Sequence, residues 1–177
     1  MSDKGLTHLY YGDGKGKTTA AIGLALRAAG CGRSVVVVFF LKDWNCGEFN
    51  SLEIIPKVTV FRGKSSGSVF VCDMSDEEKA ETKAIQDENL RKALELQVNG
   101  QCDLLVLDEA IDAYQLGVLD AVLFEGLLKD KPESMELVIT GHRPNAELLE
   151  HADYVTEMIK RKHPYDRGVS ARRGIEF

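Results

Sequence analysis

Long basic runs and long apolar runs are both absent from this sequence of 177 residues, whose formal net charge is -6 at pH 7. A protein that follows a nucleic-acid backbone neutralises phosphates with clustered Lys and Arg side chains. We therefore expect no nucleic acid among its partners. No apolar run approaches the roughly 20 residues that a membrane-spanning helix needs, and the N-terminal stretch MSDKGL has no apolar signal core. These absences predict a soluble, cytoplasmic protein with no membrane partner.

Cysteine is also scarce, and its spacing excludes two kinds of site. The four cysteines, Cys31, Cys46, Cys72 and Cys102, are widely separated and form no Cys-x-x-Cys pair. Neither a zinc ribbon nor a redox pair is therefore indicated. We expect four reduced thiols, most of them buried.

What the sequence does contain is an alternation of strand and helix patterns. The run VVVVFFL at 35–41 is typical of a strand covered on both faces. Other strands are predicted at 6–11, at 58–61, in CDLLVLDE and at 136–141, and helices at 16–30, at 76–98 behind a capping box, and at 119–129, with a last helix and strand within 145–159. The alternation predicts a single α/β domain over 1–177, with a mostly parallel sheet of the P-loop NTPase (RecA-like) type and helices on both faces.

A glycine-rich stretch, YYGDGKGKTTAA, lies between the first predicted strand and helix. Backbone N–H groups in such a turn converge at the positive end of the helix dipole and form an anion site. Lys17 and Thr18 have the positions of the lysine and hydroxyl of a phosphate loop. The loop is one residue shorter than usual, because Tyr11 stands where the first glycine is expected. The alternative is a glycine turn with a surface lysine.

Two carboxylates follow the buried run LLVL. Asp108 and Glu109 stand at the carboxyl end of a predicted parallel strand, the edge at which such sheets bind ligands. A hard cation such as Mg²⁺ prefers oxygen ligands. The alternative is a helix N-terminus at which acids are favoured by the dipole. Together with the glycine loop, the pair predicts a Mg-nucleotide enzyme of the P-loop class.

Over about residues 6–177 the chain resembles the P-loop ATP:corrinoid adenosyltransferases, which transfer the 5′-deoxyadenosyl group of ATP to the cobalt of a reduced corrinoid. The shortened loop GDGKGKTTAA is similar to the family's own variant. The strand VVFFLK ending at Lys42, the LDE of 107–109, the VITG of 138–141 and the passage ADYVTEM follow in the family's order. The C-terminal KHPYDRGVSARRGIEF is similar to the family signature almost residue for residue.

The resemblance implies that ATP lies in the loop in the direction opposite to the usual one, so that C5′ of its ribose faces the corrinoid. Cobalt(I) then attacks C5′ and expels triphosphate without a general base. Lys17 and the N–H groups of 14–19 would stabilise the triphosphate, while Thr18 and Glu109 hold Mg²⁺ with Asp108 in support. Arg27 matches a family arginine that can reach a phosphate. The loop residues implied in nucleotide binding are Gly12, Asp13, Gly14, Lys15, Gly16, Lys17, Thr18 and Thr19.

The chain also departs from the family pattern. Gly141 is followed by His142 and then Arg143, where many members have Gly-Arg, so either side chain could meet the corrinoid. The Phe and Trp that usually lie close together before the long helix are replaced by SGSVFVCDM. Phe70 is the predicted apolar wedge beneath the corrin, and the alternative is a core Phe at the start of a short strand.

Two other functions agree with parts of the sequence. A kinase or synthetase on the same fold, for example one similar to thymidine kinases, would release ADP, but the zinc-binding cysteine cluster of those kinases is missing. A nucleotide-gated corrinoid carrier would bind without turnover. The family resemblance further implies a flavoprotein reductant and a homodimer, and it leaves open whether the acceptor is a complete cobalamin or an incomplete corrinoid.

Overall fold

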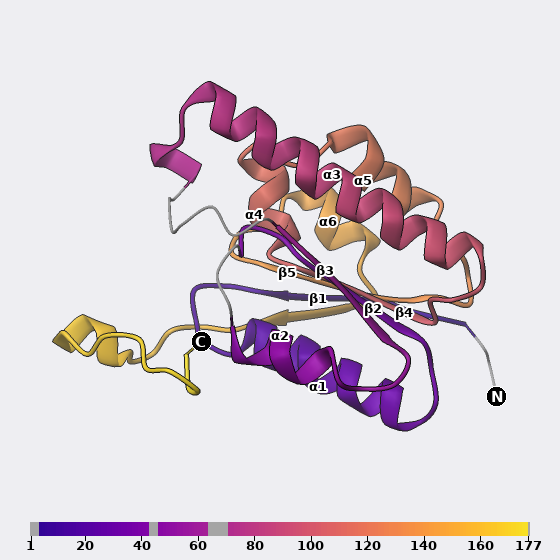
Figure 1. Cartoon of the computed structure of the whole chain (residues 1–177). Coiled ribbons are helices and arrows are strands. Elements are labelled where there is room, and N and C mark those ends of the chain that lie inside the picture. Colours follow the sequence, from indigo (N-terminus) through magenta and orange to yellow (C-terminus); the bar gives the residue numbers. More distant parts are fainter. Residues whose placement is uncertain (1–3, 43–45, 64–70, 177) are drawn as a thin grey trace.

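The computed structural model describes residues 4–42, 46–63 and 71–176. Its centre is one six-stranded parallel sheet in the order β3-β2-β4-β5-β1-β6 (Figure 1). The strands are β1 (Thr7–Tyr11), β2 (Val35–Phe39), β3 (Val58–Arg62), β4 (Leu104–Asp108), β5 (Glu136–Gly141) and β6 (Tyr154–Glu157). The predicted parallel α/β sheet is confirmed.

The helices cover both faces of the sheet, as predicted (Figure 1). They are α1 (Lys17–Gly30), α2 (Gly47–Leu52), α3 (Asp76–Val98), α4 (Ala110–Gln115), α5 (Ala121–Lys129) and α6 (Ala146–His151), with 3₁₀ turns η1 (Val71–Asp73) and η2 (Pro164–Arg167). Helices α1 and α2 pack on one face, and α3 to α6 on the other. Every residue of β2 and β4 is buried, because both strands lie inside the sheet with helices on each side.

Helix α3 begins at the predicted capping box. The Ser75 hydroxyl accepts from the Glu78 N–H, and the Glu78 carboxylate accepts from the Ser75 N–H. The middle of its buried face is more polar than an amphipathic pattern predicts, with Gln86, Asp87 and Asn89 buried beside Leu90. Asp87 accounts for part of this, because its carboxylate accepts the N–H of Asp120 at the start of α5.

Several local predictions were wrong. Helices α2 and α4 were not predicted, and both are only six residues long. Half of the cysteines are buried rather than most, because Cys31 and Cys72 are exposed, although all four thiols are free. The short strand considered as an alternative near Phe70 does not form at Val71–Asp73, which make a 3₁₀ turn; Phe70 itself lies outside the described residues.

The C-terminal segment after β6 extends beyond the sheet on the side of the glycine loop, drawn in yellow in Figure 1. It returns to the loop at two places. The Lys160 N–H donates to Asp13 Oδ1 at 3.0 Å, and Lys15 Nζ donates to Glu176 Oε1 at 2.9 Å. Across the ranges that the structure describes, no helix is long and apolar enough to cross a membrane.

Candidate active site

The carboxyl ends of β1, β4 and β5 meet at one edge of the sheet. Tyr11 of β1 pairs with Gly141 of β5, and Asp108 of β4 pairs with Phe39 of β2. The glycine loop leaves this edge after Tyr11 and enters α1 at Lys17, with Gly16 as the N-cap residue. Parallel strands therefore bring the loop and the acidic pair, about 90 residues apart in the sequence, to one place.

The loop glycines are required by a close approach of backbone. A Cβ atom at Gly12 would lie 2.5 Å from the carbonyl oxygen of Met158, and one at Gly14 would lie 2.6 Å from the same atom. The Gly14 N–H donates to that carbonyl at 2.7 Å. Gly12 and Gly16 also have φ angles of 112° and 118°, which disfavour other residues. The segment after β6 thus forms one wall of the loop.

Lys17 lies inside the loop and donates to its carbonyl groups. Its Nζ is 2.7 Å from the Gly12 oxygen and 3.1 Å from the Gly14 oxygen. Burial lowers the pKa of this ammonium, and the nearby carboxylates, Asp112 first among them, partly oppose the effect. An ammonium held in this way can exchange loop carbonyls for the oxygens of a phosphate.

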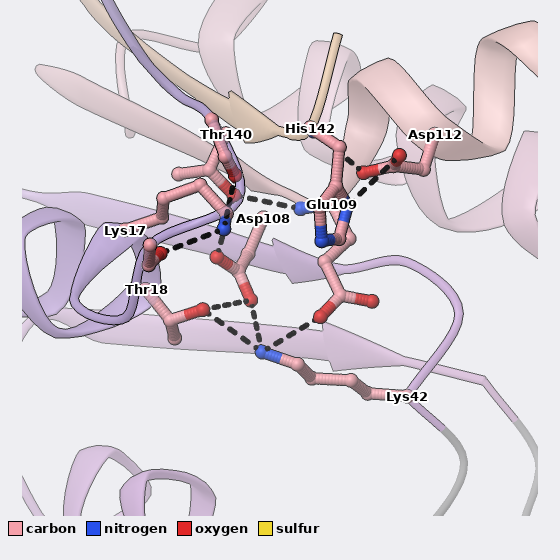
Figure 2. Close-up of polar contacts among 10 residues, drawn as sticks. Lys17, Thr18, Lys42, Asp108, Glu109, Asp112, Thr140 and His142 are labelled. Atoms are coloured by element: carbon pink, nitrogen blue, oxygen red, sulfur yellow. Dashed lines mark hydrogen bonds and ion pairs between the residues drawn. The ribbon is translucent and has the colours of Figure 1, made fainter. Parts of the chain in front are cut away.

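Asp108 is fully buried and is held by hydroxyl and ammonium donors (Figure 2). Its Oδ1 accepts from Thr140 Oγ1 at 2.8 Å, and its Oδ2 accepts from Thr18 Oγ1 at 3.2 Å and from Lys42 Nζ at 2.5 Å. A buried carboxylate is stable only when such partners satisfy it. Asp108 therefore fixes the Thr18 hydroxyl at the start of α1.

Glu109 has an uncommon backbone conformation, and its carboxylate lies 3.4 Å from Lys42 Nζ. Its φ of 61° is left-handed, and its N–H donates to Thr140 Oγ1 at 2.9 Å. Such a conformation costs about 1 to 3 kcal/mol and is enriched at functional sites. Burial raises the pKa of the Glu109 carboxyl and Asp108 raises it further, while Lys42 lowers it. Keeping the Glu109 carboxylate charged at this position thus costs free energy, and a bound cation would lower that cost.

The oxygen atoms at this edge suit a cation that is coordinated by the protein and by a nucleotide together. Within the described ranges, no three His, Cys, Asp or Glu side chains come together as a metal cluster. One hydroxyl and one or two carboxylates suit Mg²⁺, which takes few protein ligands and completes its shell with phosphates and water. Thr18 and Glu109 are the residues that could hold it.

Two loop side chains are engaged elsewhere in this structure. Asp13 binds the Lys160 N–H, which lowers the pKa of its carboxyl. Lys15 binds the carboxylate of Glu176 and the carbonyl of Ile175. Thr19 is exposed in the first turn of α1. Their predicted contacts with a nucleotide stay predictions, whereas the structural role of Asp13 and Lys15 in holding the C-terminal segment was not foreseen.

Two other predicted site residues are exposed in this structure. Arg27 is exposed in the last turn of α1, and at a rise of 1.5 Å per residue it lies about 13 Å along the helix from Thr18. Arg143 is exposed after β5, and its carbonyl accepts from the Gln115 side chain. Phe70 lies outside the described residues. His142, by contrast, is placed at the site, because its N–H and its ring contact the Asp112 carboxylate at 3.1 Å each (Figure 2).

Two residues of the site were missed in the sequence. Lys42 was noted only as the end of a strand, and Thr140 only as part of VITG. Thr140 is completely buried near the end of β5. A threonine directly after the apolar residues LVI of that strand could have indicated a buried polar contact. Lys42 could be found only from the sheet order, which places β2 directly beside β4.

Comparison with known proteins gives one consistent family. The sequence profile of the family described as ATP:corrinoid adenosyltransferase BtuR/CobO/CobP matches residues 3–177. The corrinoid adenosyltransferase of Escherichia coli (strain K12) is 36% identical over 180 aligned residues, covering 100% of this chain and 88% of that protein. The corrinoid adenosyltransferase CobA of Salmonella typhimurium is 34% identical with the same coverage. The enzyme of that name from Pseudomonas aeruginosa is 30% identical, covering 99% of this chain and 85% of that protein.

Solved structures agree on the fold. EssC (ATPases 2 and 3) from Geobacillus thermodenitrificans superposes with a TM-score of 0.53 at 13% identity, covering 98% of this chain and 35% of that one. At this identity the likeness concerns the P-loop ATPase fold alone. The family is shown by the profile match over nearly the whole chain and by the relatives that align along its full length. The chain belongs to the ATP:corrinoid adenosyltransferase family.

Proposed function

We propose that the protein catalyses in-line attack of a corrinoid cobalt(I) on C5′ of ATP, with triphosphate as the leaving group. The electron pair of cobalt(I) forms the Co–C bond, and the pair of the broken C5′–O bond leaves on the triphosphate. The observation that carries the proposal is that the Lys17 ammonium, the Thr18 hydroxyl and the Glu109 carboxylate belong to one polar cluster between the start of α1 and the end of β4 (Figure 2). These groups suit charge neutralisation on a polyphosphate rather than proton transfer.

The loop residues bind and orient the leaving group in this proposal. The N–H groups of 15–19 lie at or just before the start of α1, where the helix dipole favours anions, whereas the Gly14 N–H is taken by the Met158 carbonyl. Lys17 exchanges the carbonyls of Gly12 and Gly14 for phosphate oxygens. With the triphosphate fixed here in the direction opposite to the usual one, C5′ is presented to the corrinoid, and the gain comes from positioning.

Thr18 and Glu109 hold Mg²⁺ in this proposal, with Asp108 in support. The Thr18 hydroxyl donates its hydrogen to Asp108 Oδ2 and can direct a lone pair at the metal. Mg²⁺, when bound, neutralises negative charge on the triphosphate. Asp108 orients Thr18 and is itself fixed by Thr140.

Further parts of the proposal concern the corrinoid and its delivery. Phe70 is the proposed wedge that excludes water beneath the corrin, so that cobalt(II) loses an axial ligand and is reduced more easily. A flavoprotein supplies the electron, the enzyme is a cytoplasmic homodimer, and the acceptor is either a complete cobalamin or an incomplete corrinoid. His142, whose ring contacts the Asp112 carboxylate, competes with Arg143 as the side chain that meets the corrinoid.

The test identifies the products of ATP and a chemically reduced cobalt(I) corrinoid, with cobalamin and an incomplete corrinoid offered separately. We expect a light-sensitive Co–C bond and one equivalent of intact triphosphate, and no cleavage of ATP in the control without corrinoid. ADP as the primary product would favour a kinase. Binding of both substrates without any adenosylated product would favour a carrier.

The metal assignment is tested with Glu109→Gln. The amide is a neutral and weaker ligand for a hard cation, so half-maximal activity should need more Mg²⁺. Glu125 is an unsuitable control because its carboxylate accepts from the Tyr114 hydroxyl at 2.6 Å. Glu150→Gln, at an exposed position on α6, is the matched control. Equal Mg²⁺ dependence of the two variants would remove Glu109 from the metal site.

A further inference from the structure

We propose that the Lys42 ammonium holds the cation position of the ligand-free site, and that Lys42 must leave this position when the divalent cation binds. The inference rests on the proposed function, because it concerns the same cluster of oxygens. It assigns a role to a residue outside the glycine loop. Lys42 follows β2, the strand next to β4, and so approaches the acidic pair from the side opposite to Thr140 (Figure 2).

The geometry places one ammonium among three oxygens. Lys42 Nζ lies 2.5 Å from Asp108 Oδ2, 3.0 Å from Thr18 Oγ1 and 3.4 Å from Glu109 Oε1. The Lys42 side chain is only 13% exposed. A lysine on the surface seldom gives up its hydration in this way. The position is therefore built to be occupied by a positive charge.

The hydrogen bonds of Thr18 show why the ammonium and the metal compete. The Thr18 hydroxyl donates its hydrogen to Asp108 and accepts from Lys42. A hydroxyl that binds a cation uses a lone pair, and Lys42 takes a lone pair of Thr18 while it also lies near Glu109 Oε1. A cation shared by Thr18 and Glu109 must enter the space that the ammonium fills.

The charges at this position also indicate that the ammonium and the metal compete for it. Asp108 and Glu109 supply two negative charges, and Lys42 neutralises one of them. A divalent cation neutralises both, so that an ammonium left in place would repel it at short range. Lys42 stays tethered at the end of β2 after it leaves, and it can then pair with the triphosphate, an anion that arrives together with the cation.

The two lysines of the site have different partners, which separates their roles. Lys17 donates to the loop carbonyls of Gly12 and Gly14. Lys42 instead pairs with the carboxylates of the metal site. Lys17 is thus set to exchange carbonyls for phosphate, whereas Lys42 is set to exchange with the metal.

The experiment measures Mn²⁺ binding to the protein without nucleotide, by the loss of the free-ion EPR signal. We expect Lys42→Met to bind Mn²⁺ at least tenfold more tightly than the wild type, and Mn²⁺ to raise its melting temperature more than that of the wild type. Lys42→Arg, which keeps the charge, should gain no affinity. The matched control is Lys83→Met, because Lys83 also lies between two carboxylates, 2.6 Å from Asp87 and 3.5 Å from Asp120, outside the site.

Equal Mn²⁺ affinity of Lys42→Met and the wild type would overturn the inference, as would an equal gain in Lys83→Met. A parallel titration with ATP present tests the proposed metal site separately. In one outcome, Glu109→Gln weakens Mn²⁺ binding in the presence of ATP while Lys42→Met binds Mn²⁺ no more tightly than the wild type in its absence. That result would support the proposed metal site and refute the proposed role of Lys42. If Lys42→Met does not fold, NMR of the wild type with ¹³C-methylated lysines decides. The Lys42 signal, assigned with Lys42→Arg, must shift on addition of Mg²⁺ and ATP, and an unchanged signal would overturn the inference.

Discussion

Replacing Thr140 with valine removes one hydroxyl and almost no volume, yet the structure predicts a large loss of stability. Thr140 is completely buried, and its Oγ1 makes two hydrogen bonds. It donates to Asp108 Oδ1 at 2.8 Å and accepts from the Glu109 N–H at 2.9 Å. Water cannot readily replace the hydroxyl, because Asp108 is also fully buried.

The magnitude follows from those two bonds. A hydrogen bond to a charged group contributes about 1.5 to 3 kcal/mol, and one between neutral groups about 0.5 to 1.5 kcal/mol. Thr140→Val should therefore lower the free energy of unfolding by about 2 to 4.5 kcal/mol. Thr140→Ser keeps the hydroxyl and loses one methyl group, which costs about 1 kcal/mol. In a domain of this size each kcal/mol lowers the melting temperature by about 2 to 4 °C.

The assay is urea unfolding of the three proteins without ligand, followed by the Mg²⁺ dependence of their activity. The valine variant should be less stable than the serine variant, the reverse of the order for a residue that only fills space. It should also need more Mg²⁺, since Asp108 and Glu109 lose a shared support. If the valine variant were as stable as the serine variant, or more so, the Thr140 hydroxyl would have no such role.

Three other changes have defined outcomes. Lys17→Ala should lower turnover by about two orders of magnitude or more while the melting temperature changes little, and near-normal turnover would remove the loop as the triphosphate site. Gly14→Ala should lower both the melting temperature and the affinity for ATP, because its Cβ would lie 2.6 Å from the Met158 carbonyl oxygen. Gly23→Ala in α1 is the control: its Cβ would have no neighbouring atom within 4 Å, so this variant should be more stable by about 0.5 to 1 kcal/mol. In the folded protein the pKa of the Glu109 carboxyl is raised above its ordinary value of 4.5. The protonated carboxyl therefore adds to the free energy of unfolding below pH 4.5, and this contribution is lost as the pH rises through the folded-state pKa. Calorimetry should show wild-type stability falling relative to Glu109→Gln over that range, and a constant difference would contradict the shift.

The parts of the fold that follow from local pattern were predictable. The fully buried β2 and β4 appear as unbroken apolar runs, and the capping box at Ser75 marks the start of α3. Helix α4 was missed because it begins directly after β4, through the left-handed Glu109, without a turn residue in the sequence. A six-residue helix also carries too few turns for its period to be recognised.

The same distinction, between features with a local sequence pattern and features that depend on long-range contacts, applies to the candidate site. Thr18, Asp108 and Glu109 were predictable because each lies at the junction of a strand and a helix. Lys42 meets them only through the sheet order, since contacts across parallel strands have no local signature. The position of the C-terminal segment was not predictable for a related reason: its partners, such as Asp13, lie far away in the sequence.

That long-range contact affects how the protein folds. The Lys160–Asp13 hydrogen bond joins residues 147 positions apart, and Gly14 meets the backbone of Met158 in the same layer. Closing so large a loop costs chain entropy before any contact compensates for it. The glycine loop is therefore expected to be among the last parts to reach its final shape, although its residues are synthesised long before Met158. A nascent chain that has not yet reached Met158 has the glycines but lacks one wall of the site.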